Sequence, residues 1–411
     1  MPKKQSILAF GFDAFGQCSG ASSADNKSHL ATDSVVSLTP VAQDTTFLEL
    51  AATLSCSFAL SSDQRIHIWG CTELFTGISG GPSYVRVWLP EVDYGAIRKI
   101  LPARSTLDAH HQDAIFALVN NELRLLTFAP SKKQVEGHDQ KRRRVEDHPV
   151  FEGLDTTTAT SCNDITTTSL PFACVDVAVT SNHGAALTTS GDIMTWTLGS
   201  AVFTRIHDPL DGGPRFHSLA SGRLHFMSLT SRNEVYTWGS SGLHGQMGHG
   251  TSETHVKPNP EVIEALQGLK ATHVAGGGWH SAVATADGDI YTFGSPLKGQ
   301  LGLAVSDPGS VATSANTSEA PINHAIPSPV DFEFGSLHLK VACGSQHTIV
   351  SNGTVLYGCG WTKYNQLGLG TQISEIHEFR PIALPDMDSK VNIADICCGD
   401  WHTLVLVEWD E

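Results

Sequence analysis

Apolar residues recur along the chain in short paired runs, not in long amphipathic stretches. In HSAVATADGDIYTFG, residues 280–294, two runs of apolar and β-branched residues flank Asp287-Gly288. Asn352-Gly353 occupies the same place between a later pair of runs. Glycine accepts the positive φ of tight hairpin turns, so such dipeptides between apolar runs indicate β-hairpins. The pattern predicts short antiparallel strands.

Some of these runs are apolar or aromatic on both faces. In VYTWG, residues 235–239, Val235 and Thr237 point to one side and Tyr236 and Trp238 to the other. A strand that is buried on both faces lies between two layers. Sheets stacked around an axis satisfy this condition, because each sheet covers its neighbours.

One unit of about 30 residues returns at 216–250, 271–303 and 339–370. Its order is Gly-x-x-His, an apolar strand, a polar turn, an aromatic strand, Gly, and then Gly/Asn-Gln-hydrophobe-Gly. We interpret the conserved order within the chain as a structural repeat, with these residues at its Gly-x-x-His positions: Gly222, His225, Gly277, His280, Gly344, His347, Gly399 and His402.

Weaker copies keep the same spacing. Thirteen residues separate His225 from Trp238, and the same interval separates His183 from Trp196 and Cys56 from Trp69. Residues 97–128 read as a decayed copy without the histidine. The spacing therefore extends the repeat over most of the chain.

The two chain ends are complementary half-repeats. Residues 7–17 hold the late part of a unit, with Gly16-Gln17, and residues 393–409 hold the early part. Pairing them completes one sheet and removes an unpaired strand edge. With six internal units, the sequence predicts an all-β, seven-bladed β-propeller that is closed by its N- and C-terminal strands and forms a single domain over 1–411.

Two segments interrupt the repeat. Residues 130–170 are polar and charged, and we expect a flexible insertion there. It contains a basic run, Lys141, Arg142, Arg143 and Arg144, which is typical of a nuclear-import signal, of a nucleic-acid patch or of a solvated loop; we favour nuclear import. Residues 304–329, rich in Ser, Pro and Ala, predict a long loop between strands.

Composition narrows the function. The net charge of −16 disfavours unaided binding to nucleic acid or anionic membranes, since phosphate neutralisation needs clustered Lys and Arg. The nine scattered cysteines fit reduced thiols. We find no signal peptide or membrane span in the sequence and expect a soluble monomer in the nucleus, the cytoplasm or both.

The Gly-x-x-His…aromatic-Gly…Gly-Gln-Leu-Gly unit resembles the regulator of chromosome condensation repeat family. The resemblance is most specific in 216–303 and 339–409 and weakest in 72–170. It implies a seven-bladed propeller. The segments FGFDAFGQ, VACGSQHTIV and the stretch 261–294 are most similar to small nuclear adaptors of this family, which implies chromatin association and a JmjC-domain oxygenase as partner.

Two other functions stay open. The resemblance also implies guanine-nucleotide exchange on a small GTPase, an activity of the family's founding member. A fungal relative, the alpha-tubulin suppressor, implies an adaptor in tRNA and diphthamide modification. We favour a non-enzymatic protein-binding scaffold, because no Gly-x-Ser-x-Gly elbow, Walker loop or paired-carboxylate motif occurs.

The repeated histidines do not predict a metal site. Each belongs to a separate unit without a second ligand at suitable spacing, so we expect each ring to bond backbone within its own blade. No catalytic, cofactor or metal residue is predicted.

Loops around a propeller rim favour partner contacts through aromatic residues and arginine. The candidates are Arg215, Arg223, Trp279, Gln346, Trp361, Tyr364 and Trp401.

Overall fold

The computed structural model describes residues 3–11, 36–37, 46–53, 56–70, 84–87, 97–103, 114–119, 122–127, 165–250, 256–303, 323–370, 372–384 and 391–410. Within these ranges the chain is all-β, apart from two single turns of 3-10 helix, η1 (Pro209–Asp211) and η2 (Glu264–Leu266). The predicted all-β class is confirmed.

The described strands form seven four-stranded antiparallel sheets, which we number I to VII. Sheet I contains β1 (Lys3–Gly11), β2 (Val36–Ser37), β27 (Asn392–Cys398) and β28 (His402–Asp410), and sheet II contains β3 (Phe47–Ala52), β4 (Cys56–Ser61), β5 (Ile66–Gly70) and β6 (Tyr84–Val87). Sheet III contains β7 (Ile97–Ala103), β8 (Ala114–Val119), β9 (Glu122–Thr127) and β10 (Ile165–Ser169), and sheet IV contains β11 (Cys174–Val179), β12 (His183–Thr188), β13 (Ile193–Thr197) and β14 (Thr204–His207).

The remaining sheets come from the most regular repeats. Sheet V contains β15 (Phe216–Ser221), β16 (His225–Thr230), β17 (Val235–Gly239) and β18 (Lys257–Val262), and sheet VI contains β19 (Ala271–Gly276), β20 (His280–Thr285), β21 (Ile290–Gly294) and β22 (His324–Pro329). Sheet VII contains β23 (Lys340–Cys343), β24 (His347–Ser351), β25 (Leu356–Trp361) and β26 (Glu375–Ile382).

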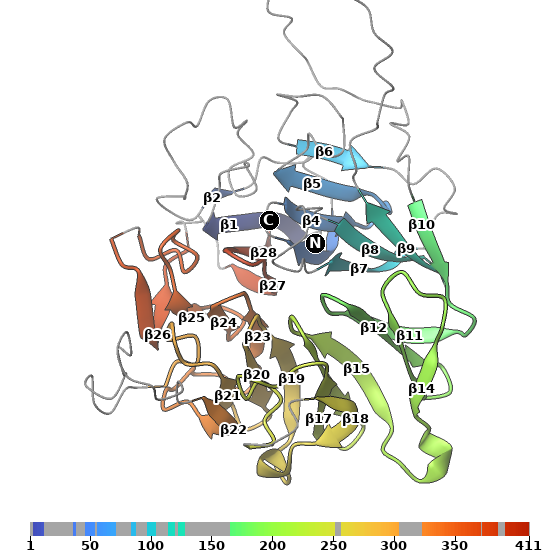
Figure 1. Ribbon diagram of the computed structural model, residues 1–411. Helices are drawn as coiled ribbons and strands as arrows, with labels where there is room; N and C mark the ends of the chain where they lie inside the picture. Colours follow the sequence, from blue (N-terminus) through green and yellow to red (C-terminus); the bar gives the residue numbers. More distant parts are fainter. Residues whose placement is uncertain are drawn as a thin grey trace, which may run out of the picture.

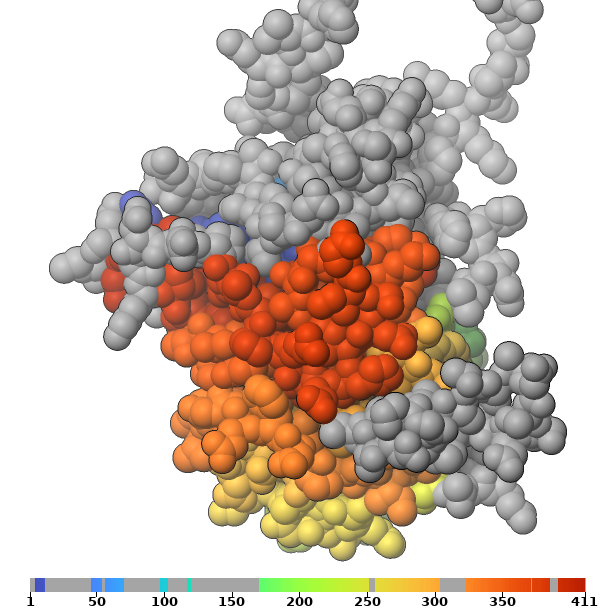
Figure 2. Space-filling model, turned by 90° about the vertical axis from the view of Figure 1, so that its left-hand side faces the viewer, coloured from blue at the N-terminus to red at the C-terminus, as the bar shows by residue number. Residues whose placement is uncertain are grey.

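The sheets are arranged around an axis (Figure 1). One edge strand of each sheet is innermost, and each inner strand lies against the inner strand of the next sheet. The inner strands follow one another in the order β27, β3, β7, β11, β15, β19, β23 and again β27. In Figure 2 the yellow, orange and red sheets succeed one another along one side of the molecule.

Sheet I unites the two ends of the described chain. Strand β1 pairs antiparallel with β28 along its whole length, from Lys3 opposite Asp410 to Gly11 opposite His402. The edge that either strand would expose alone is thereby paired.

The structure corrects the bounds of the two predicted insertions. Residues Ile165–Ser169, at the end of the predicted 130–170 loop, form β10 and pair with β9. Residues His324–Pro329, at the end of the predicted 304–329 loop, form β22 and pair with β21. Each segment therefore contains the fourth strand of a sheet. The sequence did not predict these strands, because polar residues and proline are not typical of a strand interior. The decayed copy at 97–128 thus supplies three strands of sheet III.

The core lies between neighbouring sheets. Strands β4, β16 and β20 are buried at every position. Between sheets IV and V, Leu187 and Ile193 pack with Phe226 and Trp238, whose rings stack with centroids 5.3 Å apart. Burial on both faces follows because each sheet has a sheet on either side.

Candidate functional site

The Gly-x-x-His segments are the turns that join the inner strand of a sheet to its second strand; we call them the histidine turns (222–225, 277–280, 344–347 and 399–402). Their glycines allow the imidazole to lie against the backbone. A Cβ at Gly344 would lie 2.0 Å from Cε1 of His347, and one at Gly222 would lie 2.0 Å from Cε1 of His225. Any larger residue displaces the ring.

Each of these four histidines bonds a hydroxyl of the next sheet. The Nε2 to Oγ distances are His225–Ser281 2.7 Å, His280–Thr348 2.9 Å, His347–Thr403 3.2 Å and His402–Ser57 3.0 Å. The expected bond to backbone within the same blade is therefore wrong. Sequence spacing could not reveal this partner, because the hydroxyl is contributed by a different repeat. It directly follows the histidine, or Cys56, of its own repeat.

Three of these hydroxyls also donate to a second loop. The glutamine turns, the Gly/Asn-Gln-hydrophobe-Gly segments at 245–248, 299–302 and 365–368, follow the third strand of sheets V, VI and VII. Ser281, Thr348 and Thr403 donate to the carbonyls of Gln246, Gln300 and Gln366, at 2.8, 2.6 and 2.8 Å. A hydroxyl has one proton to donate, so the imidazole Nε2–H is the donor to it.

We call each such pair of histidine and hydroxyl a latch; in three of the four latches the hydroxyl also donates to a glutamine-turn carbonyl. Burial lowers the pKa of His347 and of His402 to about 3, so both rings are neutral at pH 7. A neutral, fully buried imidazole with hydrogen-bonded neighbours is a structural element. These histidines hold sheets together.

The histidine turns are also joined to one another through their backbones. Ser181 N donates to Arg223 O, Arg223 N to Gly277 O, and Gly278 N to Gly344 O, at 2.9, 3.0 and 3.1 Å. Ser345 N then donates to Asp400 O at 3.1 Å. This belt holds the backbones of neighbouring turns together.

Three of the predicted partner-binding residues meet on this face. Trp361 ends β25, the third strand of sheet VII, and Tyr364 follows it; Trp401 lies in the histidine turn of sheet I. Their ring centroids are 5.4 Å (Trp361–Tyr364), 5.9 Å (Trp361–Trp401) and 5.7 Å (Tyr364–Trp401) apart. All three side chains are partly exposed. We call them the aromatic cluster.

A second group of predicted residues lies on the same face. The Arg223 guanidinium carbon is 5.4 Å from the Trp279 ring centroid, within range of a cation–π contact. His244 of the adjacent glutamine turn contacts the same ring, with centroids 4.7 Å apart. Leu243 beside it is 58% exposed, so an apolar side chain accompanies the group at the surface.

The other predicted residues are placed differently. Gln346 lies in the histidine turn of sheet VII, between the two aromatic groups, and is partly exposed. Arg215 is exposed but precedes β15, and the start and end of a strand lie on opposite faces. It is therefore separated from the rest. The basic run Lys141–Arg144 lies outside the described residues.

The sequence reasoning missed a ring of polar side chains on the inner strands. Six of the seven inner strands have a bulge near their start, and the residue after it is Glu49, Lys99, Asp176, Ser218, His273 or Asp395. Lys340 begins the seventh. A bulge redirects a side chain. A polar residue that recurs near the third position of the inner strands is the sequence pattern that could have predicted this ring.

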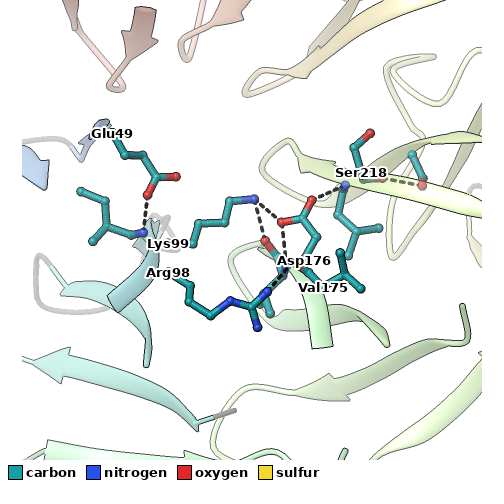
Figure 3. Close-up of polar contacts among 10 residues, drawn as sticks. Glu49, Arg98, Lys99, Val175, Asp176 and Ser218 are labelled. Atoms are coloured by element: carbon teal, nitrogen blue, oxygen red, sulfur yellow. Dashed lines mark hydrogen bonds and ion pairs between the residues drawn. The ribbon is translucent and has the colours of Figure 1, made fainter. Parts of the chain in front are cut away.

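The axial residues connect neighbouring sheets (Figure 3). Glu49 Oε2 accepts from Ile100 N at 2.7 Å, and Asp176 Oδ2 accepts from Leu219 N at 2.7 Å. Lys99 Nζ lies 2.5 Å from Asp176 Oδ1. In each contact a side chain of one sheet reaches the inner strand of the next.

A similar pattern continues in the later sheets. His273 Nδ1 accepts from Val341 N at 3.3 Å, and Lys340 Nζ donates to Ala394 O at 2.5 Å. Burial, with a smaller effect from Lys340, lowers the pKa of His273 to about 4. Burial raises the pKa of Asp395.

Within the ranges described above, no group of three or more His, Cys, Asp or Glu side chains is placed to hold a metal ion. In the same ranges, no helix has the length and apolar character needed to cross a membrane.

The repeats of this chain match the family model "Regulator of chromosome condensation (RCC1) repeat" at residues 232–284, 287–351 and 355–406. A second model of the same repeat matches 271–300. Residues 232–406 thus contain RCC1 repeats, and the resemblance of the sequence to this repeat is confirmed.

Individual relatives agree with this class. The chain is 35% identical over 221 residues to human RCC1 domain-containing protein 1, covering 48% of this chain and 57% of that protein. It is 31% identical over 244 residues to the Ultraviolet-B receptor UVR8 of Arabidopsis thaliana, covering 56% and 50%. The chain thus matches little more than half the length of these relatives.

Solved structures share the fold. The crystal structure of Prp20p from Saccharomyces cerevisiae matches with a TM-score of 0.72 at 16% identity, covering 100% of this chain and 93% of that one. Human WBSCR16 matches with a TM-score of 0.64 at 16% identity, covering 98% of each chain. Enzymes among the relatives, such as the human ligase HERC2, match over as little as 5% of their own length.

Proposed function

We propose that the seven sheets form one closed, seven-bladed propeller. The order of inner-strand contacts, which returns from β23 to β27, supports this architecture. So does the pairing of β1 with β28 in the sheet that completes the order. A closed ring is rigid enough to present loops at fixed positions.

We further propose that the protein is a non-enzymatic scaffold that binds a partner protein on the face of the histidine turns. The aromatic cluster of Trp361, Tyr364 and Trp401 carries this proposal, because two sheets contribute to it and it stands on a hydrogen-bonded belt. Clustered aromatic side chains on a rigid support are typical of binding hot spots.

We propose an adaptor role in the nucleus, with a JmjC-type oxygenase as partner. The similarity to human RCC1 domain-containing protein 1 supports this choice of partner, together with the segments noted in the sequence. The oxygenase would supply the chemistry and the propeller the recognition surface.

The partner and its binding face can be tested together by affinity purification. We expect the wild-type chain to recover the oxygenase and Trp361→Ala/Trp401→Ala to lose at least tenfold of it, since hot-spot truncations cost about 2 kcal/mol or more. Lys363→Glu at an exposed position beside the cluster should weaken recovery without altering the fold. Arg215→Ala, on the opposite face, is the matched control.

The outcomes separate the alternatives. Equal loss with Arg215→Ala, or no loss with the cluster variants, would contradict this choice of face. Recovery of a small zinc-binding protein would favour the role in tRNA and diphthamide modification. Recovery of no stable partner would count against the scaffold itself.

Nucleotide exchange on a small GTPase is a second candidate. The fold is shared with Prp20p, a protein with binding properties to Gsp1p and histones. A nucleotide-release assay with a Ran-type GTPase tests this activity. Our scaffold proposal expects no acceleration over the spontaneous rate, and measurable acceleration would reverse the order of the two candidates.

A further inference from the structure

Glu49 lies on the inner strand of sheet II, at the bulge that turns its side chain toward the axis. Its Oε2 accepts from the amide of Ile100 on β7, at 2.7 Å (Figure 3). Gln64 of sheet II makes a similar contact, accepting from the amide of Ile97 at 2.9 Å. Two amides of β7 therefore fasten sheet III to sheet II; we call this junction the II–III seam.

The charged groups around Glu49 leave its carboxylate poorly compensated. From sheet III, Lys99 faces it, but the Lys99 ammonium is bound to Asp176 and to the Val177 carbonyl, at 2.5 and 3.1 Å. From sheet IV, Asp176 adds a like charge, and from sheet I, Asp395 adds another.

The remaining axial groups do not supply a counter-charge. Lys340 on sheet VII lies 3.8 Å from Asp395 and donates to Ala394 O. Burial keeps His273 on sheet VI neutral at pH 7, and Ser218 on sheet V is uncharged. Burial, reinforced by the two aspartates, raises the pKa of Glu49 to about 7 from an ordinary 4.5.

The II–III seam differs from the latched junctions in its residues. Cys56 stands in sheet II at the position of the latch histidine, and Ile115 stands in sheet III at the position of the hydroxyl. Cysteine and isoleucine at these two positions supply neither the imidazole nor the hydroxyl of the latch. The seam depends more strongly on its axial contacts as a result.

We propose that the II–III seam is proton-linked: Glu49 holds a proton while β3 and β7 are packed together, and releases it to water when they separate. In the packed seam, the neutral carboxyl still accepts from the Ile100 amide through its carbonyl oxygen. In the separated seam, water solvates the carboxylate, so ionisation favours opening. Alkaline conditions loosen this junction before the latched junctions.

Hydrogen–deuterium exchange of the peptides that contain β3 and β7 tests the seam in the full chain. With carboxyl pKa values of about 7 packed and 4.5 exposed, the opening equilibrium should rise roughly tenfold from pH 6 to pH 8, after correction for the intrinsic exchange rate. The glutamine in Glu49→Gln accepts from the amide but does not ionise. Its opening equilibrium should be constant over this range.

Asp287→Asn in the exposed hairpin of sheet VI is the control and should behave as wild type. Equal pH dependence in wild type and Glu49→Gln would overturn the proposal. If Glu49→Gln does not fold, carbon-13 titration of the labelled wild-type glutamate carboxyls decides: a Glu49 resonance that titrates near 7 supports the seam, and one that titrates near 4.5 excludes it.

Discussion

Two groups of junctions between sheets differ in their polar contacts. Latches join the pairs V–VI, VI–VII, VII–I and I–II, whereas charged side chains lie at the pairs II–III and III–IV. In the latched region, buried imidazoles bond hydroxyls, three of which donate in turn to backbone carbonyls. At III–IV, Lys99 pairs with Asp176, and Arg98 Nη1 donates to Cys174 O at 2.8 Å. One fold thus stacks its sheets by two different sets of polar contacts.

The comparison explains why the repeat is visible in one half of the sequence and decayed in the other. A latch needs residues from two successive repeats, so loss of either partner removes the constraint on both. His183 of sheet IV illustrates this, because the residue opposite it in sheet V is Phe226, not Ser or Thr. The histidine and hydroxyl of the repeat are therefore required by the contact between two sheets and not by the fold of a single sheet.

Acid should produce the largest difference between the two regions. His347 and His402 have folded pKa values of about 3, below the 6.5 of an exposed imidazole, so their stabilisation is present above pH 6.5 and is lost as the pH falls toward 3. Between pH 6.5 and 5 each ring costs about 2 kcal/mol of unfolding free energy. Glu49 changes in the opposite direction, gaining stability as it is protonated.

Hydrogen exchange at pH 5 and pH 7 measures this contrast. We expect β24 and β28 to lose protection at pH 5 while β3 and β7 keep theirs. A uniform response of all sheets to pH would contradict the division into two regions.

Removal of one latch should have the next largest effect. His347→Ala leaves a cavity and removes a bond to Thr403, and we expect about 3 kcal/mol of destabilisation in urea unfolding. His183→Ala is the matched control, since this ring is partly exposed and the hydroxyl position of the next sheet is occupied by Phe226; we expect less than about 1 kcal/mol there. Equal losses would mean that the histidines act only by filling space.

The charged junction can be weakened by Lys99→Met. This change keeps the length of the side chain but leaves Asp176 without its cation and Val177 O without its donor. We expect a loss of about 2 kcal/mol, because a partly buried carboxylate loses its counter-charge. The pair of Lys257 and Glu261 supplies the control, because its carboxylate is 47% exposed and is solvated without the lysine: Lys257→Met should cost about 0.5 kcal/mol or less. Urea midpoints measure both variants.

The sequence predicted the strands, the hairpins and the terminal half-repeats, because apolar alternation and turn dipeptides are local signals. It also predicted an aromatic surface, and Trp361, Tyr364 and Trp401 do meet. It could not predict the partner of His225, since Ser281 belongs to the next repeat. The axial ring was missed for the same reason. Glu49 and Lys99 belong to different repeats, and they come together only because a bulge in each strand turns the side chain toward one axis.

The smallest expected effect tests the hydroxyl of a latch. Thr403→Val preserves the volume and the β-branching of the side chain but removes the hydroxyl that accepts from His347 and donates to Gln366 O. We expect a loss of about 1–2 kcal/mol, because two buried groups lose one bond each. Thr403→Ser restores the hydroxyl and should recover most of the stability, with a small deficit from the missing methyl group. If Ser and Val destabilise equally, as judged by urea midpoints, the hydroxyl contributes nothing and the junction is held by packing alone.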